Sequence, residues 1–337
     1  MRPMFRPGLS CAWRSDNCLH LDVDNPNPIL LGSLPSQAAA ALDLMDGTRT
    51  LDELIATLQQ SGPVSGVRDM VRRLVDLGAV IDCRVWPGGR KVATDSRNRL
   101  LPDLTASGPR DPDEWWERLA QTHVVVIGAS RLGSLIASTL ATAGVGRVTV
   151  DDRRKITEGD LVHGGFTSSD VGRRRCELFI LHPELQAMKR TNRPFSRRLY
   201  VVTDCVDADL RGSALMRQGS AHLVVRSSGR TGRVGPFVVP GQTACLFCVH
   251  LHHRDHDPAW PMVWRQVQWD ATPVTHSITV GITANTAASH VLAWMNGDEP
   301  ASMRGLVDVD GTLGTPQFRS TPVHPECGCG WAETAAS

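Results

Sequence analysis

Residues 123–152, HVVVIGASRLGSLIASTLATAGVGRVTVDD, constrain the fold of this chain more than any other stretch. Their pattern predicts a strand, a glycine turn, a helix and a second strand, in that order. Further strand-like runs at 198–203 and 222–226 alternate with helical stretches. Such alternation predicts an α/β fold with a Rossmann-like, doubly wound and largely parallel sheet, which we assign to residues 113–337. Beyond residue 230, GRVGPFVVPGQTACLFC is predicted to be a hairpin that carries a cysteine pair, and ITANTAASHVLAWMNG is predicted to be a helix.

The glycine turn contains Gly128, Ser130 and Gly133 at the carboxyl end of a predicted strand, where open α/β sheets bind ligands. The amides at the start of the following helix favour a phosphate. Nucleotide-binding turns have a glycine where this chain has Ser130, although a serine hydroxyl is small and can hydrogen-bond an anion. A lone match of this kind is weak, so an ordinary βα turn without a ligand remains the alternative.

Two acids, Asp151 and Asp152, end the second strand roughly 20 residues after the turn. A carboxylate at this point of the fold can accept a hydrogen bond from a ribose hydroxyl. We therefore predict ribose contact for this pair, and the alternative is a solvated strand end.

Residues 1–90 have a different pattern and are assigned to a small α+β domain. Asn-Pro pairs break the strand-like run 17–32, and Thr50 with Glu53 forms a capping box at a helix start. The next helix has an apolar stripe and is followed by an alternating, strand-like run. Helices followed by a strand predict a winged-helix-like unit. The stretch from about 86 to 112 is rich in glycine, proline and charge, and residues 91–112 are predicted to be a linker.

The cysteines indicate a metal site. There are nine, an odd number, and four of them fall into two tight pairs, which favours metal binding over disulfides. Thiolates suit zinc, and two distant pairs would fasten the tail to the middle of the domain. We predict a structural zinc ion, with free thiols as the alternative. The predicted ligands are Cys245, Cys248, Cys327 and Cys329.

The composition excludes some classes of protein. The chain of 337 residues is 41% apolar and 21% charged, which is typical of a globular protein with a sizeable core. Its net charge of +1 gives no general reason to expect nucleic acid or a membrane as partner. The sequence also has no apolar run long enough for a transmembrane helix and no secretory signal, so we expect a cytoplasmic protein.

Six motifs occur together in an order and spacing that resemble the ThiF/MoeB family, the bacterial relatives of ubiquitin-activating enzymes. They are GASRLGS, VTVDD, GDLVHGGFTSSDVGRRRCE, VVTDCVDADLR, CLFC and HPECGCG, and they cover roughly residues 113–332. The resemblance implies a homodimer that uses ATP and magnesium to adenylate the C-terminal carboxylate of a peptide or small protein. It also implies that the zinc ion is structural.

The resemblance assigns roles to single residues. Gly128, Ser130 and Gly133 fall on the family's glycine loop, and Asp151 falls on its ribose-binding acid. Asp207 falls on the aspartate that holds magnesium and the triphosphate, since carboxylate oxygens bind hard cations. Without the resemblance, Asp207 would be a cap or turn acid.

The chain departs from the family at several of these positions. Arg175 replaces the phosphate-binding lysine and keeps its charge, so Asp207 and Arg175 are the candidate catalytic residues. His163 replaces an arginine that contacts phosphates, and Ala208 replaces an asparagine. With Ser130, these changes lie on the predicted nucleotide pocket.

Two features of the family have no clear counterpart, and a third is predicted at a histidine cluster. We find no N-terminal arginine element of the kind that reaches across the family's dimer; the candidates to replace it are Arg131, Arg153, Arg154 and Arg173. No cysteine is placed as a thioester nucleophile, since Cys176 and Cys205 fall inside predicted elements. His250, His252, His253 and His256 are predicted on the family's crossover loop over the substrate tail, with replacement of a zinc ligand as the alternative.

The N-terminal unit resembles the peptide-recognition domain of ribosomal-peptide modification systems, in which a leader peptide adds a strand to the wing. A DNA-binding winged helix is the alternative, but the mixed charge of SGVRDMVRRLVDLG disfavours it. Two functions therefore stay open. The protein is an enzyme that adenylates a peptide, or it is a non-catalytic scaffold that presents a leader peptide to a separate cyclodehydratase and has a degenerate ATP site.

Overall fold

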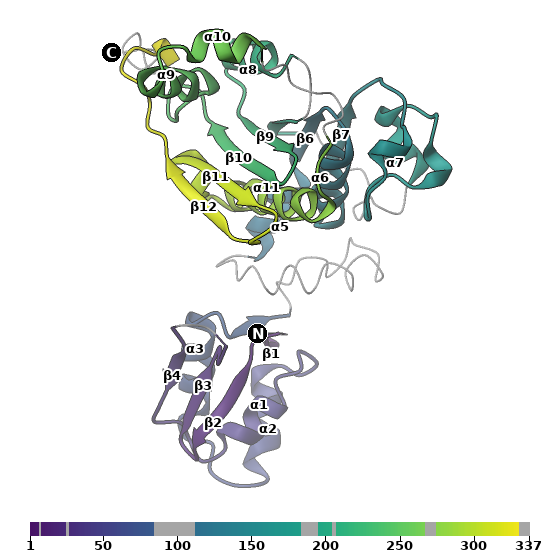
Figure 1. The fold of residues 1–337 in the computed structure, drawn as a ribbon. Coiled ribbons are helices and arrows are strands. Elements are labelled where there is room, and N and C mark those ends of the chain that lie inside the picture. The colour runs from purple at the N-terminus through teal and green to yellow at the C-terminus, as the bar shows by residue number, and fades with distance from the viewer. Residues whose placement is uncertain are drawn as a thin grey trace. The chain divides into compact units, whose positions relative to one another are not determined.

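A computed structural model describes residues 1–6, 8–24, 27–83, 112–182, 195–203, 207–266 and 274–329. The chain divides into two compact units, Met1–Glu117 and Arg118–Ser337, which are described separately below (Figure 1). Apart from residue 112, the predicted linker 91–112 lies outside the described residues. The proposed domain boundaries therefore stay predictions.

Within the described residues up to 83, the N-terminal unit has two small antiparallel sheets and three helices. One sheet pairs β1 (Pro3–Phe5) with β5 (Val80–Asp82). The other has the order β2 (Cys11–Ser15), β3 (Cys18–Leu21), β4 (Ile29–Leu31). The helices are α1 (Ala38–Asp43), α2 (Leu51–Gln59) and α3 (Val67–Asp76). This is the small α+β unit expected ahead of the larger domain.

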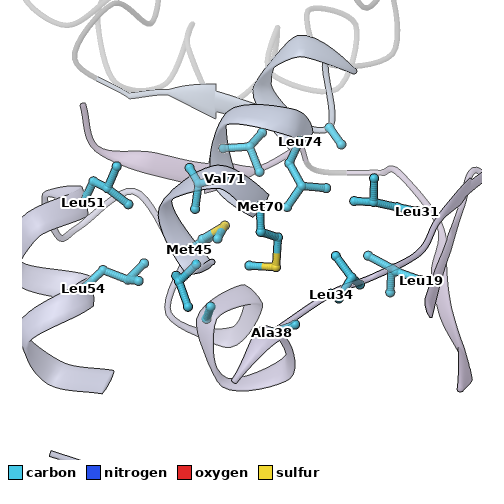
Figure 2. Packing of buried hydrophobic residues seen from close by; sticks show 14 of the residues in the cluster. Leu19, Leu31, Leu34, Ala38, Met45, Leu51, Leu54, Met70, Val71 and Leu74 are labelled. Atoms are coloured by element: carbon cyan, nitrogen blue, oxygen red, sulfur yellow. The ribbon is translucent and has the colours of Figure 1, made fainter. Parts of the chain in front are cut away.

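Local sequence signals explain these helices. The Glu53 amide donates to Thr50 Oγ1 at 3.2 Å and the Thr50 amide donates to Glu53 Oε2 at 2.7 Å, so the predicted capping box is present. The apolar stripe of α3 is fully buried. In Figure 2, its side chains Met70, Val71 and Leu74 lie between leucines of α2 and leucines of the strands. One hydrophobic core thus joins all three helices to the sheet β2-β3-β4.

The second unit is built on a seven-stranded sheet with the order β12-β11-β10-β9-β8-β6-β7 (Figure 1). Strands β6 to β9 pair in parallel, whereas β9 to β12 pair antiparallel. The α/β fold class is therefore confirmed, with a mixed sheet whose first half is parallel. The strands are β6 (Thr122–Ile127), β7 (Arg147–Asp151), β8 (Arg197–Val202), β9 (His222–Ser228), β10 (Thr231–Val238), β11 (Gly305–Asp310) and β12 (Pro316–Ser320).

Helices connect and cover this sheet. α6 (Arg131–Thr142) links β6 to β7, and α8 (Ala208–Arg217) links β8 to β9. The predicted helix α11 (Ser277–Asn296) packs on α6 and on strands β9 to β11. The other helical segments are α5 (Pro112–Ala120), η1 (Glu158–Asp160), η2 (Ser168–Asp170), η3 (Arg175–Glu177), α7 (Leu178–Leu181), α9 (Leu246–His256), α10 (Trp260–Gln266) and η5 (Ala301–Met303).

Two predictions about the region after residue 230 are wrong. The first cysteine pair does not lie on a hairpin strand, because β10 ends at Val238, and Cys245 and Cys248 lie at the start of α9. The histidines 250–256 lie on that same helix and not on a loop. None of the helices in the described residues is long and apolar enough to cross a membrane.

Candidate functional site

The glycine turn joins β6 to α6. Gly128 has a φ of +86°, which glycine adopts without steric cost. A Cβ on Gly133 would lie 2.1 Å from the carbonyl oxygen of Gly128, so only a glycine lets α6 approach the turn this closely. Ser130 is the buried N-cap residue of α6, and its hydroxyl does not cap the helix. The two glycines thus perform the structural tasks of a nucleotide-binding turn.

Two predicted nucleotide-site acids meet at one arginine. Asp151 ends β7, and Asp207 is the N-cap residue of α8, which follows β8. Arg211 places its Nε 3.0 Å from Asp207 Oδ2 and its Nη1 3.7 Å from Asp151 Oδ2. All three side chains are about half exposed, at 46%, 53% and 45% for Arg211, Asp151 and Asp207. Both carboxylates are therefore close together and open to solvent.

Asp152, the residue after Asp151, is buried. Its Oδ2 accepts hydrogen bonds from the amide of Ala129 at 2.9 Å and from Arg154 at 2.7 Å. Burial alone would raise the pKa of Asp152, but the bonds from Arg154 and Ala129 outweigh it and lower the pKa to about 2. Asp152 is thus a stable carboxylate that holds the glycine turn.

Arg175 is the partner of Asp152 and of a third acid, Asp160. Its Nη2 donates to both oxygens of Asp160, at 2.7 and 2.8 Å, and its Nη1 lies 3.1 Å from Asp152 Oδ2. The side chains of Arg175 and Asp160 are 2% and 0% exposed. The guanidinium is therefore used to join the glycine turn to the β7–β8 connection. The proposed phosphate contact would require a rearrangement.

The remaining predicted pocket positions are spread out. His163 is exposed between η1 and η2, while Ala208 is buried in the first turn of α8. Arg131, a candidate substitute for the cross-dimer arginine, donates instead to Thr275 O at 2.8 Å. Cys205 lies outside the described residues, and Cys176 is a half-buried free thiol.

The four predicted zinc ligands converge. Their Sγ atoms all lie within 4.8 Å of one another, with 3.6 Å between Cys245 and Cys327 and 3.4 Å between Cys248 and Cys329. Tetrahedral zinc with bonds of about 2.3 Å requires sulfur atoms about 3.8 Å apart. The site therefore has the size and donor set for zinc, and it joins the start of α9 to the C-terminal segment.

The hydrogen bonds inside the site favour one thiolate, that of Cys248. A hydrogen bond from the Cys245 thiol, assisted by the His324 amide, lowers the pKa of Cys248, whereas the same hydrogen bond and burial raise the pKa of Cys245. His324 is buried and places Nε2 2.7 Å from Asp255 Oδ2. The four cysteines form the one metal-ligating cluster found in the described part of the chain, and the histidines of α9 are not in it.

Sequence reasoning missed the partners of the predicted residues. Arg211 follows Asp207 by four positions in a helix, a spacing typical of ion pairs that could have identified it. Asp160 lies in the motif GDLVHGGFTSSDVGRRRCE, and nothing local shows that it would bind Arg175, 15 residues away.

Comparisons with known proteins agree with this fold. A model of the ThiF family matches residues 96–182. Two Mycobacterium tuberculosis proteins named probable adenylyltransferase/sulfurtransferase MoeZ are 35% identical over 91 residues, which is 26% of this chain. The matched stretch is only 21% of the length of those relatives.

The structural similarity extends over nearly the whole chain. E. coli MccB with ATP has a TM-score of 0.67 and 16% identity, covering 98% of this chain and 100% of that one. The microcin C7 biosynthetic enzyme MccB in complex with N-formylated MccA has a TM-score of 0.69 and 14% identity, with the same coverage. A heterocyclase in complex with substrate and cofactor has a TM-score of 0.62 and 12% identity, covering 97% of this chain and 39% of that one. At these identities the similarity shows a common fold.

Proposed function

We propose that the protein binds a peptide or small protein and adenylates its C-terminal carboxylate with ATP and magnesium. The observation that carries this proposal is the convergence of the glycine turn, Asp151 and Asp207, which follow three parallel strands at the carboxyl edge of the sheet. The common fold with MccB, whose structures include complexes with ATP and with MccA, supports it.

The residues of this edge fit the reaction. A carboxylate oxygen of the peptide attacks the α-phosphorus of ATP, the bond from that phosphorus to the bridging oxygen breaks, and pyrophosphate leaves. The amides of the α6 start would face the phosphates and Asp151 the ribose. Asp207 would hold magnesium, which offsets the negative charge on the leaving pyrophosphate.

The N-terminal unit has a surface suited to the peptide. β4 is an edge strand of its sheet, and its residues Ile29 and Leu30 are 39% and 50% exposed. α3 lies beside it, because both Nη atoms of Arg73 donate to the carbonyl oxygen of Gly32 at 3.2 Å. An extended peptide would add a strand to β4 and place apolar side chains against Ile29 and Leu30.

The test is pyrophosphate exchange into ATP, together with calorimetric ATP binding in the presence of magnesium. Peptides encoded by neighbouring reading frames would serve as substrates. We expect Asp207→Asn to reduce exchange by about a hundredfold, as removal of one charge-stabilising group does elsewhere. Asp298→Asn, an exposed acid that follows α11, is the matched control. If neither ATP binding nor pyrophosphate exchange is seen with any peptide, the proposed adenylation activity is refuted.

One observation favours the second candidate, a scaffold without catalysis. Arg175, at the position of a phosphate-binding lysine, is bound to Asp152 and Asp160 inside the protein. The common fold with part of a heterocyclase supports this candidate as well. A scaffold would bind a leader peptide through the β4 edge without binding ATP, and it would lower the KM of a separate cyclodehydratase for that peptide.

A further inference from the structure

The antiparallel half of the large sheet has one polar, open face. The strand register pairs Arg226 with Arg233, Arg233 with Asp308, and Asp308 with Gln317, so the four residues form a row across β9 to β12. The opposite face packs on α11, where a Cβ on Gly232 would meet the side chain of Thr283. The row therefore points away from α11, and it lines an open depression of about 420 Å³.

This face has an excess of positive charge. Asp308 binds both Arg233 at 2.6 Å and Arg319 at 3.1 Å, so these three side chains together carry one positive charge. Arg226 adds a second positive charge, which also helps to lower the pKa of Asp209 in α8. The other acid of the depression, Asp310, accepts the amide of Thr312 in its own turn at 2.7 Å. This face therefore contains three arginines and two aspartates, so positive charge is in excess.

The arginines of this face also lower the pKa of a neighbouring histidine. His253 of α9 lies beside Arg319, as part of a small depression between α9 and strands β11 and β12. Burial, followed by the positive charges of Arg319 and Arg233, lowers the pKa of His253 to about 4. His253 is therefore neutral near pH 7, and the positive charge of this face comes from its arginines.

The face begins next to the candidate nucleotide edge. Val202, the last residue of β8, pairs with Val224, so Arg226 lies two residues beyond the end of β8. The Arg226 guanidinium lies 5.6 Å from the ring centre of Trp264. The Trp264 indole donates to Asp209 in the first turn of α8 at 2.6 Å, and its ring packs against the apolar cluster that contains Ile127. Ile127 directly precedes Gly128 in the glycine turn.

We infer that this face binds the last residues of an acidic peptide, with Arg226 nearest to the nucleotide edge and Arg233 and Arg319 farther along the peptide. The inference rests on the proposed function and gives its substrate a chemical character. Guanidinium groups bind carboxylates with two parallel hydrogen bonds, which amide side chains would not match in strength. Asp308 and Asp310 disfavour a polyanion of high charge density such as RNA or DNA.

The test compares two fluorescein-labelled peptides of equal length, ending in Glu-Asp-Glu-Gly and Gln-Asn-Gln-Gly, by fluorescence anisotropy with the full chain and without ATP. We expect the acidic peptide to bind about tenfold more tightly at low salt, and the difference to shrink as salt is added. Arg226→Gln and Arg233→Gln should each remove most of this difference. Arg217→Gln, an exposed arginine at the end of α8, should leave it unchanged.

A gain of affinity gives a stricter test. Asp308→Asn removes a negative charge from the row and should tighten binding of the acidic peptide by about threefold, a result that misfolding would not produce. Equal affinities for both peptides, no binding of either, or equal displacement by a single-stranded oligonucleotide would overturn the inference. Because ATP is absent, a failure of adenylation does not affect this result. Conversely, if Arg226→Gln and Arg233→Gln leave the rate of pyrophosphate exchange unchanged, the inference is refuted and the proposed function stands.

Discussion

Asp152 accepts hydrogen bonds from a turn amide and from two arginines, and these contacts determine how the candidate site responds to acid. The side chain of its neighbour Asp151 is half exposed and lies 3.7 Å from Arg211. Adjacent carboxylates therefore have different tasks: one fixes the backbone of the turn, and the other is available to a ligand.

The stability of the second unit should depend on the protonation of Asp152. Its pKa is about 2 in the folded protein against an ordinary 3.8, so the folded state binds fewer protons between these values. The stabilisation, about 2 kcal/mol, is complete above about pH 4 and is lost as the pH falls toward 2. Asp152→Asn should remove this stabilisation at pH 7 and reduce the fall in the free energy of unfolding between about pH 4 and about pH 2, measured by urea denaturation. Asp151→Asn should keep that fall. An unchanged fall in Asp152→Asn would contradict the assignment.

The Arg175–Asp160 pair should behave as a buried ion pair. Arg175→Met leaves Asp160 buried without its guanidinium, which should lower the free energy of unfolding by about 3 kcal/mol or more. Adding Asp160→Asn removes the stranded charge, so the double variant should be more stable than Arg175→Met alone. Denaturant unfolding of the two single variants and the double variant gives the coupling energy. Strict additivity would show that the pair is not coupled.

At the scale of single residues, the sequence predicts positions better than partners. The cysteine ligands and the acids Asp151 and Asp207 could be found because they occur in local motifs. The environments of Arg175 and Asp152 could not, because their partners come from the β7–β8 connection, whose short 3₁₀ turns carry no helical or strand periodicity. Because this segment buries Arg175, the residue expected to bind phosphate is part of an internal ion pair.

The helix α6 can begin where it does only because Gly133 has no side chain. Its first turn passes so close to the β6 end that the carbonyl oxygen of Gly128 occupies the space of a Cβ. The same helix has the largely apolar, deeply buried surface expected between a sheet and α11. Contacts with the glycine turn and with α11 therefore determine the position of α6.

Two glycine-to-alanine substitutions in helices should have opposite effects. Gly133→Ala should shift the turn and destabilise the protein by about 2 kcal/mol or more, as overpacking of a tight contact does. Gly281→Ala, in α11, meets no atom within 4 Å and should stabilise it by about 0.5 to 1 kcal/mol through helix propensity. Thermal and urea unfolding measure both effects. Destabilisation of equal size in the two variants would show that close approach at Gly133 is not the cause.

At the scale of elements, strong periodicity gave correct predictions and weak periodicity did not. The parallel strands and α11 were predicted, since valine-rich runs and a long apolar helix are distinctive. α9 was missed because its sequence, LFCVHLHHRDH, has no clear apolar stripe, and only Cys248, Val249 and Leu251 are buried. Its N-cap, Cys245, also lacks a hydroxyl or carboxylate that would mark a helix start.

The four-cysteine cluster connects distant parts of the second unit. Cys245 and Cys327 are 82 positions apart, and their sulfur atoms are 3.6 Å from each other. A bound ion would thus close a long loop that includes α10, α11 and the two last strands. The proposed homodimer and the separate cyclodehydratase partner stay predictions at this scale.

Metal removal should therefore weaken the whole second unit. We expect about one zinc ion per chain by elemental analysis, and replacement by cobalt should give the absorption of a tetrahedral thiolate site. Cys245→Ser or a strong chelator should lower the free energy of unfolding by about 4 kcal/mol, comparable to opening a covalent cross-link over a loop of this length. Cys176→Ser, a half-buried thiol outside the cluster, is the control. A native protein purified without metal and with full stability would contradict the site.

The position of Arg211 between Asp151 and Asp207 has a consequence for ligand entry. Two carboxylates at one edge repel each other, and the guanidinium acts as a built-in counterion that keeps them together before any ligand arrives. Since all three groups are half exposed, this counterion is held weakly and can be displaced at little cost. A metal ion at Asp207 would exchange with a charge already present, so its arrival should release Arg211 toward the incoming phosphates.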